Sequence, residues 1–302
     1  MLKCVVFPVT AYGYEVLLSA KEQIDGALAS GGVLSRMVCI REESGLEEMP
    51  GYASDTDGDV NKEAFSKEEV LFVTDSRRMF DFLQDTGCYS IAFYHEKNKQ
   101  VFFDGALYAV EDIGQLPLKS YEEAYRRLAH MPWDILETEH LKLRESTVED
   151  VEDFYRIYSE PSVTRHMEDL FSDPDEERAY MEDYIKQFYG FYGFGMWTVI
   201  YKETGKVIGR AGLSVREGYE LPELGFVIEV PFQRKGLAYE VCQGILEYAQ
   251  EELLFDKLQA LVEPENVASI KLLEKLGFVF LRNVTENCRK YRLFIKENEN
   301  GI

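Results

Sequence analysis

The 302-residue sequence lacks the features of a membrane-spanning or secreted chain. No apolar run approaches the roughly 20 residues that a membrane-spanning helix needs. The N-terminal apolar run Met1–Phe7 is short, stops at Pro8, and is not followed by a signal-peptide cleavage region. We therefore expect a cytoplasmic protein with no membrane partner.

Cysteine and positive charge are both scarce. The five cysteines are scattered and never form a close CxxC pair, so neither a disulfide framework nor a metal site is indicated. The chain has 33 basic against 55 acidic residues, a formal net charge of −22 and a pI near 4.7. Such a charge repels nucleic acid and anionic membranes, so we expect no nucleic-acid partner. It favours a cationic substrate only weakly, because an acidic surface also serves solubility.

The composition is that of a folded chain, with 46% hydrophobic and 13% aromatic residues. The length exceeds the usual size of one hydrophobic core, which favours two domains. A short connector, His130–Asp134, suggests a boundary near residue 137, with domains at 1–137 and 138–302.

The first half reads as strands alternating with helices. Val70–Thr74 and Tyr89–Phe93 are short buried-strand patterns, and the amphipathic stretch Arg77–Gln84 lies between them. Leu107–Val110 predicts a further strand and Ser120–Leu128 a helix. This alternation predicts a small parallel α/β domain of three layers.

The second half alternates less regularly and predicts a seven-stranded mixed sheet with helices on both faces. The residues 203–206 form a hairpin-turn pattern between two of its strands. The expected strands include Leu141–Arg144, Met196–Tyr201, Val207–Val215, Leu224–Ile228 and Leu258–Val262, followed by two closing strands. One helix is expected to begin near Val148, and three more are expected over Asp175–Tyr189, Leu237–Gln250 and Val267–Leu276.

The segment Val230–Ala238 lies between a predicted strand and a predicted helix. Gly236 lacks a Cβ and Ala238 is small, so successive backbone N–H groups can point outward at the helix N-terminus. Arg234 and Lys235 add positive charge in an otherwise acidic protein. This pattern predicts an anion-binding cradle, although Gly236 would also suit an ordinary turn.

A second motif follows the next strand: Glu263–Ser269 opens a helix, and Leu272–Phe278 ends it with Lys-Leu-Gly-Phe. Together with Gln233–Ala238, it resembles the two signature motifs of the GNAT N-acetyltransferases. The likeness is greatest to the branch that contains the ribosomal-protein N-terminal acetyltransferases, and Glu223–Phe226 and Gly205–Gly209 support it. It covers about residues 140–295, with every element in the family's order.

The resemblance implies a splayed mixed sheet that binds acetyl-coenzyme A and transfers its acetyl group to a primary amine, on a small molecule or a protein N-terminus. The coenzyme arm would lie between the strands ending at Ile228 and Val262, with Asn266 contacting it or capping its helix. The implied coenzyme-binding residues are Phe226, Val227, Ile228, Gln233, Arg234, Lys235, Gly236, Leu237, Ala238 and Asn266.

Two residues are candidates for proton transfer. Glu223, on the strand beside the thioester, would act as general base, although it would also suit a plain surface position. Many family members place a tyrosine where this chain has Leu273, so the general acid is open. Ser269 could take that role directly or through water. A protein that binds acetyl-coenzyme A without turnover is the alternative that Leu273 favours.

The aromatic run 188–195 lies where the family builds its acceptor pocket. Tyr192, Phe194 and Trp197 are therefore candidate substrate-binding residues, with packing against the sheet as the alternative. His166 precedes this region, and a lone histidine there favours an ordinary polar role.

The first half faintly resembles a degenerate haloacid-dehalogenase-like domain around Val70–Ser76. Pro8 and Thr10 stand where that family needs two aspartates, and the acidic run Asp55–Asp59 does not follow a strand. We therefore expect a non-catalytic domain that binds a partner or metabolite, with phosphatase activity as the weaker alternative.

Overall fold

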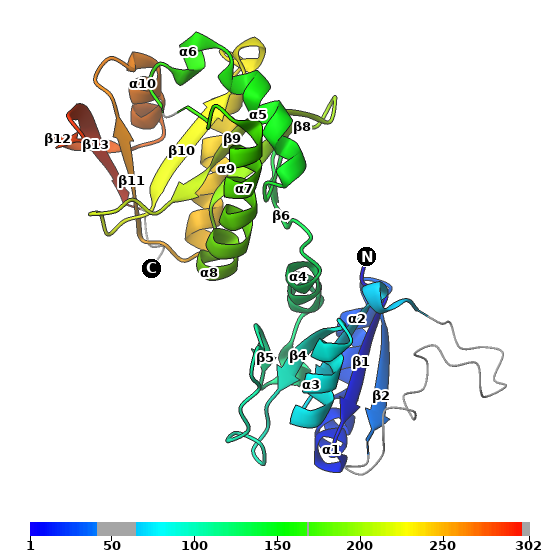
Figure 1. The fold of residues 1–302 in the computed structure, drawn as a ribbon. Helices are drawn as coiled ribbons and strands as arrows, with labels where there is room; N and C mark the ends of the chain where they lie inside the picture. Colours follow the sequence, from blue (N-terminus) through cyan, green and yellow to red (C-terminus); the bar gives the residue numbers. More distant parts are fainter. Residues whose placement is uncertain (41–64, 168, 298–302) are drawn as a thin grey trace. The chain divides into compact units, whose positions relative to one another are not determined.

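The computed structural model describes residues 1–40, 65–167 and 169–297. The chain divides into two compact units, Met1–Met131 and Pro132–Ile302 (Figure 1). Strand β6 (Asp134–Glu137) pairs within the second sheet, so the division falls before it rather than near residue 137. The acidic run Asp55–Asp59 lies outside the described residues. None of the helices in the described ranges is long and apolar enough to span a bilayer.

The first unit contains one parallel sheet with the strand order β2-β1-β3-β4-β5. Its strands are β1 (Cys4–Val9), β2 (Leu34–Cys39), β3 (Val70–Thr74), β4 (Tyr89–Phe93) and β5 (Ala109–Val110). Its helices are α1 (Ala11–Ser19), α2 (Lys21–Ala29), α3 (Arg77–Asp85) and α4 (Leu118–Leu128), with short 3-10 turns at Lys67–Glu69 and Ile113–Gln115.

Helices cover both faces of this sheet. Val5 and Phe7 of β1 pack in a cluster with residues of α1, α2 and α4, whereas Cys4 and Val6 pack in a cluster with residues of α3. Successive strand residues point to opposite faces, so β1 is apolar throughout because both faces are covered. The expected three-layer α/β architecture is confirmed.

A buried polar cluster lies at the carboxyl ends of β1, β3 and β4. The fully buried Asp75 accepts hydrogen bonds from the backbone N–H of Thr10 (2.7 Å) and from its hydroxyl (2.5 Å). The Nε2 atom of His95 lies 2.9 Å from the same carboxylate, and the Nδ1 atom accepts from the N–H of Lys97 (3.2 Å). Each of these polar groups is satisfied within the cluster, which therefore ties the strand ends together.

The cluster also explains Gly13, because a Cβ at that position would lie 2.3 Å from the Asp75 carboxylate. Pro8 and Thr10 contribute a carbonyl and a hydroxyl to hydrogen bonds with Thr74 and Asp75. The haloacid-dehalogenase resemblance of this unit stays a prediction.

Replacement of Asp75 by alanine should destabilise the first unit by about 3 kcal/mol, because the buried donors of Thr10 and His95 would lose their hydrogen-bond acceptor. Hydrogen exchange of the β1 and β3 amides measures this loss. Asp81→Ala is the matched control, since Asp81 pairs with Arg77 on the surface and should contribute under about 1 kcal/mol. Equal effects of the two substitutions would contradict the structural role of the cluster.

The second unit contains an eight-stranded mixed sheet with the order β12-β13-β11-β10-β9-β8-β7-β6. The further strands are β7 (Leu141–Arg144), β8 (Met196–Tyr201), β9 (Lys206–Ser214), β10 (Glu223–Ile228), β11 (Lys257–Val262), β12 (Val279–Glu286) and β13 (Arg289–Glu297). The helices are α5 (Val151–Tyr158), α6 (Pro161–Thr164), α7 (Pro174–Tyr184), α8 (Gly190–Tyr192), α9 (Leu237–Glu251) and α10 (Val267–Lys275). Two 3-10 turns, Val148–Asp150 and Val230–Phe232, precede α5 and α9.

The sequence predicted seven strands, and the eighth is β6. This strand is only four residues long and none of it is fully buried, so it carries little strand signal, and the sequence predicted no strand there. It pairs antiparallel with β7 at the edge of the sheet.

Opposite faces of this sheet are covered by different helices (Figure 1). Phe154 of α5 and Met181 of α7 pack with Val207 and Val227 of the sheet. Residues of α9 and α10 instead pack in the main core cluster with Trp197. The mixed sheet with helices on both faces is therefore confirmed.

The sheet splits between its two central parallel strands. β10 pairs with β9 along six residues, from Glu223 to Ile228. Its pairing with β11 is limited to Glu223 opposite Gln259. The strands therefore part toward their carboxyl ends, as expected from the sequence, and leave one side of β10 open.

Candidate functional site

The loop after β10 connects this strand to the N-terminus of α9. Gly236 has φ +88° and ψ −13°, a left-handed conformation that favours glycine, and it is the N-cap of the helix. No side chain caps α9. Within the described ranges, the backbone N–H groups of Arg234, Lys235 and Gly236 donate to no acceptor. With the unpaired first-turn N–H groups of α9, they form a run of free donors.

The same loop carries positive charge and is fastened to the strand. The Nε2 atom of Gln233 donates to the carbonyl of Ile228 over 2.8 Å, which fixes the start of the turn. Arg234 is also left-handed, with φ +59°, and both Arg234 and Lys235 are exposed. Free donors, an uncapped helix and two cations are the elements of a site for phosphate groups.

The open side of β10 lies next to this loop. Glu229 donates its N–H to the carbonyl of Ile208 on the β9 side, so by alternation the N–H groups of Phe226 and Ile228 face β11. The Ile228 carbonyl already accepts from Gln233. The Phe226 backbone is thus placed to bond an extended ligand lying between the strands.

The second motif forms the loop and helix after β11. Asn266 is the N-cap of α10, and its side chain accepts from the N–H of Ser269 over 3.2 Å. The sequence left Asn266 two possible roles, capping this helix or contacting the coenzyme arm, and the structure shows the capping role. Ser269 is half-buried one turn into the helix, whereas Leu273 is completely buried in the core cluster.

Glu223 lies at the point where β10 and β11 part. The residue is 7% exposed, and its carboxylate is held by the guanidinium of Arg216, whose Nη2 lies 3.0 Å from Oε1 and whose Nε donates to Oε2. Arg216 also donates to Glu286 of β12, with Nη1 3.0 Å from Oε2. The carboxylate is therefore fixed in position by a two-point contact.

The electrostatics of Glu223 combine two opposing influences. Burial raises the pKa of its carboxyl above the ordinary value, and the hydrogen bonds and charge of Arg216 partly offset that rise. The pKa of Arg216 is raised by its hydrogen bond to Glu223, so the arginine stays charged. A raised carboxyl pKa brings the group closer to the range in which it can accept a proton and release it again.

The candidate acceptor residues have different surroundings. Tyr192 is 40% exposed and its ring centre lies 4.7 Å from that of Phe188. Phe194 is nearly buried against Phe255. Trp197 is fully buried and packs edge-to-face on Tyr248, 5.6 Å between ring centres. Trp197 therefore packs in the core, which is the alternative to substrate binding that the sequence left open. Tyr192 remains accessible to solvent.

The segment before these aromatics is less regular than the expected helix over Asp175–Tyr189. The α-helix ends at Tyr184, a π-helical segment continues over Ile185–Tyr189, and α8 ends at Gly193 with φ +72°. Wider π-helical turns are frequent at functional sites. The side chains of this segment therefore point in other directions than they would on a regular α-helix.

One pair was missed by sequence reasoning. The Nδ1 atom of His166 lies 2.7 Å from Oε2 of Glu263, which joins the α6–α7 connection to the loop after β11. The 97 intervening residues explain why no sequence spacing indicated it. The contact links the helices on one face of the sheet to the edge of the split.

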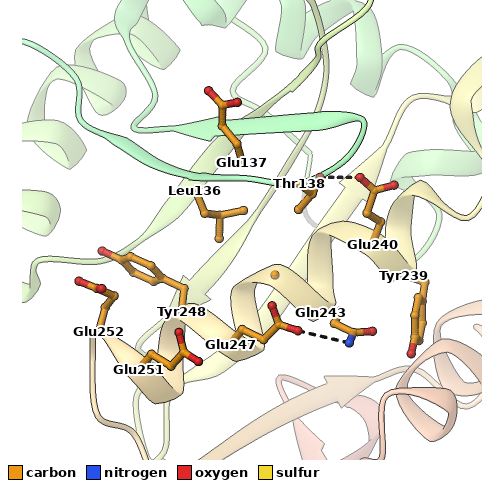
Figure 2. Close-up of a pocket in the computed structure, with 11 residues that line it drawn as sticks. Leu136, Glu137, Thr138, Tyr239, Glu240, Gln243, Glu247, Tyr248, Glu251 and Glu252 are labelled. Atoms are coloured by element: carbon orange, nitrogen blue, oxygen red, sulfur yellow. Dashed lines mark hydrogen bonds between the residues drawn. The ribbon is translucent and has the colours of Figure 1, made fainter.

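A surface cavity of about 490 Å³ lies elsewhere in this unit, between β6 and α9 (Figure 2). Five carboxylates line it, and Figure 2 shows Thr138 bonded to one of them, Glu240. The lining includes none of the predicted site residues. Because these carboxylates would repel phosphate groups, the cavity does not suit coenzyme A. The lining glutamates are Glu137, Glu240, Glu247, Glu251 and Glu252.

Comparison with known proteins gives a family match for the second unit. A family model described as an acetyltransferase (GNAT) domain matches residues 140–279. The uncharacterized N-acetyltransferase p20 of Bacillus licheniformis is 33% identical over 150 residues, covering 48% of this chain and 82% of the relative. The uncharacterized N-acetyltransferase YoaA of Bacillus subtilis (strain 168) is 29% identical over 145 residues, with coverage of 48% and 82%.

Solved structures also match part of this chain. A putative GNAT-family acetyltransferase from Bordetella pertussis matches with a TM-score of 0.48 and 19% identity, covering 54% of this chain and 99% of the other. A ribosomal-protein-S5-alanine acetyltransferase from Vibrio fischeri matches with a TM-score of 0.48 and 17% identity, covering 55% and 97%.

Proposed function

The chain belongs to the GNAT acetyltransferase family, and on that premise we propose that its second unit transfers the acetyl group of acetyl-coenzyme A to a primary amine within a ternary complex. The observation that carries the proposal is the run of free backbone donors at the N-terminus of α9, directly beside the parted strands.

In this proposal the cradle holds the coenzyme pyrophosphate. The N–H groups from Arg234 to Ala238 donate to the phosphate oxygens, and the side chains of Arg234 and Lys235 add charge. Gln233 keeps the loop in place through its bond to Ile228. The site fits a polyanion because its donors are unpaired and no acidic side chain caps α9.

The open side of β10 would hold the coenzyme arm. The backbone of Phe226 to Ile228 bonds its amides, and an N–H of this segment polarises the thioester carbonyl. Asn266 contributes from the opposite loop while it caps α10. This arrangement places the thioester near the strand that carries Glu223.

The chemical step is a direct attack of the amine nitrogen on the thioester carbon. A C–N bond forms, the C–S bond breaks, and coenzyme A leaves as the thiolate. Glu223 removes the proton of the amine, directly or through one water. The thiolate is a good leaving group, so Ser269 gives at most modest help, and the core position of Leu273 does not prevent release.

The alternative is a protein that binds acetyl-coenzyme A without turnover. Leu273 favours it, because that position has no side-chain acid. A thiol-release assay with a panel of amines distinguishes an acetyltransferase from a protein that only binds acetyl-coenzyme A. An enzyme releases thiol in step with acetylated amine, whereas a binder shows only thermal stabilisation by acetyl-coenzyme A.

Replacement of Arg216 by glutamine should move the acidic limb of the pH profile of kcat/KM to higher pH. Arg216 lowers the pKa of Glu223, so its loss raises that pKa further, and the ionised base is then lost at a higher pH. Arg178→Gln is the control, since Arg178 pairs with Glu152 and Asp175 instead. An acidic limb that does not move would remove Glu223 as the titrating base.

A further inference from the structure

Arg210 is a buried cation in the middle of the second sheet. It lies on β9, opposite Val227 of β10 and Thr198 of β8. Its residue surface is only 8% exposed, and its guanidinium lies 4.6 Å from the ring centre of Phe154 in α5. The side chain therefore points to the sheet face that α5 and α7 cover.

This guanidinium has no carboxylate partner among the described residues. The Nε atom is completely buried and has no hydrogen-bond partner within the described chain. Other arginines of the unit do have such partners: Arg144 bonds Asp150, Arg156 bonds Glu229, and Arg216 bonds Glu223. Since an arginine stays charged, burying one without an anion costs several kcal/mol.

Aromatic side chains surround the charge. Arg210 donates a hydrogen bond to Tyr158, and Tyr184, Tyr189 and the 47% exposed Tyr180 interact with the charge electrostatically. The face of Phe154 and neutral hydroxyls stabilise a cation less than a carboxylate does. The group of side chains reaches from the buried guanidinium to the surface at Tyr180, and part of it belongs to the π-helical segment.

We propose that Arg210 binds a carboxylate of the acceptor, so that the preferred acceptors are amines carrying a carboxylate a few bonds from the nitrogen. The inference rests on the proposed function. It follows from a buried guanidinium that pairs with no carboxylate in the described ranges, one strand from the β10 backbone assigned to the thioester. Neighbouring strands are about 4.8 Å apart, so the Arg210 main chain lies directly beside the β10 backbone assigned to the thioester.

Two sources share this chemistry: free amino acids, and peptides with an acidic side chain near the N-terminus. The carboxylate would form charge-assisted hydrogen bonds with the guanidinium, and the hydroxyl of Tyr184, which accepts from the N–H of Met196 and keeps its own proton free, would donate to a remaining lone pair. In a chain of net charge −22, Arg210 would offset the repulsion that such an acceptor meets elsewhere.

Paired acceptors test the proposal on the full chain. Thiol release is measured with alanine and alaninamide, and with the C-terminally amidated dipeptides Ala-Asp-NH2 and Ala-Asn-NH2. In at least one pair the carboxylate-bearing member should have a kcat/KM about 10-fold or more above its amide. The pair that discriminates identifies the source of the carboxylate.

Substitution of Arg210 must then remove the preference. Arg210→Met should bring both members of the pair to the same low kcat/KM, and Arg210→Lys should keep part of the difference, because it keeps the charge but not the two-point geometry. Thermal stabilisation by acetyl-coenzyme A shows that each variant is folded. A preference that survives in Arg210→Met, or no preference in the unsubstituted protein, overturns the inference.

Failure of the proposed function would appear differently, as no thiol release with any amine. In that case the same pairs are titrated by calorimetry into protein saturated with coenzyme A. Carboxylate-selective binding that disappears in Arg210→Met would still support the inference. Equal binding, or no binding, of the two members would overturn it.

Discussion

Gly236→Asp is expected to weaken acetyl-coenzyme A binding by about 100-fold or more, equal to at least about 2.7 kcal/mol. The left-handed φ of +88° strains any residue with a Cβ, which costs about 1–2 kcal/mol. The new carboxylate also adds negative charge beside the phosphates. Isothermal titration calorimetry measures the change, and Gly236→Val should weaken binding through strain and bulk alone.

Gly205→Asp is the matched control for this substitution. Gly205 is also left-handed, with φ +69°, and a Cβ at either glycine would meet nothing within 4 Å. It lies in the β8–β9 hairpin turn, so its substitution imposes similar strain away from the cradle. Unchanged affinity in both Gly236 variants would place the phosphate site elsewhere.

Glu223→Gln should lower turnover by roughly 100- to 10,000-fold, the range typical of general acid–base catalysis. Glutamine keeps the shape and can still contact Arg216, but it cannot accept the amine proton. The dissociation constant for acetyl-coenzyme A should barely change, because the proposed function assigns the carboxylate to the acceptor side of the thioester. Steady-state kinetics and calorimetry on the same preparation separate the two effects.

Ser269→Ala is the comparison for the base. Its effect should be much smaller, since a thiolate leaves without an acid and the backbone N–H of Ser269 still bonds Asn266 after the change. A severe loss in Ser269→Ala together with a mild one in Glu223→Gln would transfer the catalytic role to α10.

Several elements of both units were predictable from local patterns. Val70–Thr74 and Tyr89–Phe93 are strands with the bounds that the apolar runs predicted, and α9 begins at Leu237 as the glycine signal indicated. These elements combine a clear period with a clear boundary residue, so local chemistry decides them.

The parts that the sequence did not predict depend on distant contacts. β6 is stabilised by pairing with β7 rather than by its own composition. The sequence predicted one regular helix over Asp175–Tyr189, but its last five residues, Ile185–Tyr189, are π-helical. Whether a short segment pairs as an edge strand, and whether a helix changes to π-helical turns, depends on tertiary packing. Local propensity does not encode that packing.

Side-chain partners show the same limit at the site. Glu223 was chosen for its position on a strand, but its partner Arg216 comes from the loop before that strand, and Glu286 from a hairpin 63 residues further on. His166 was expected to be an ordinary polar residue, and its contact with Glu263 spans 97 residues. Only the folded sheet brings such groups together.

The central claim is that acetyl-coenzyme A lies with its pyrophosphate in the α9 cradle and its arm along β10. Amide hydrogen exchange with and without acetyl-coenzyme A tests it most directly, because the donors in question are backbone N–H groups. We predict that the ligand slows exchange at Arg234, Lys235, Gly236 and Phe226, and leaves the Gly205 turn unchanged. Slowed exchange confined to the acidic cavity between β6 and α9, with the cradle unprotected, would contradict the account.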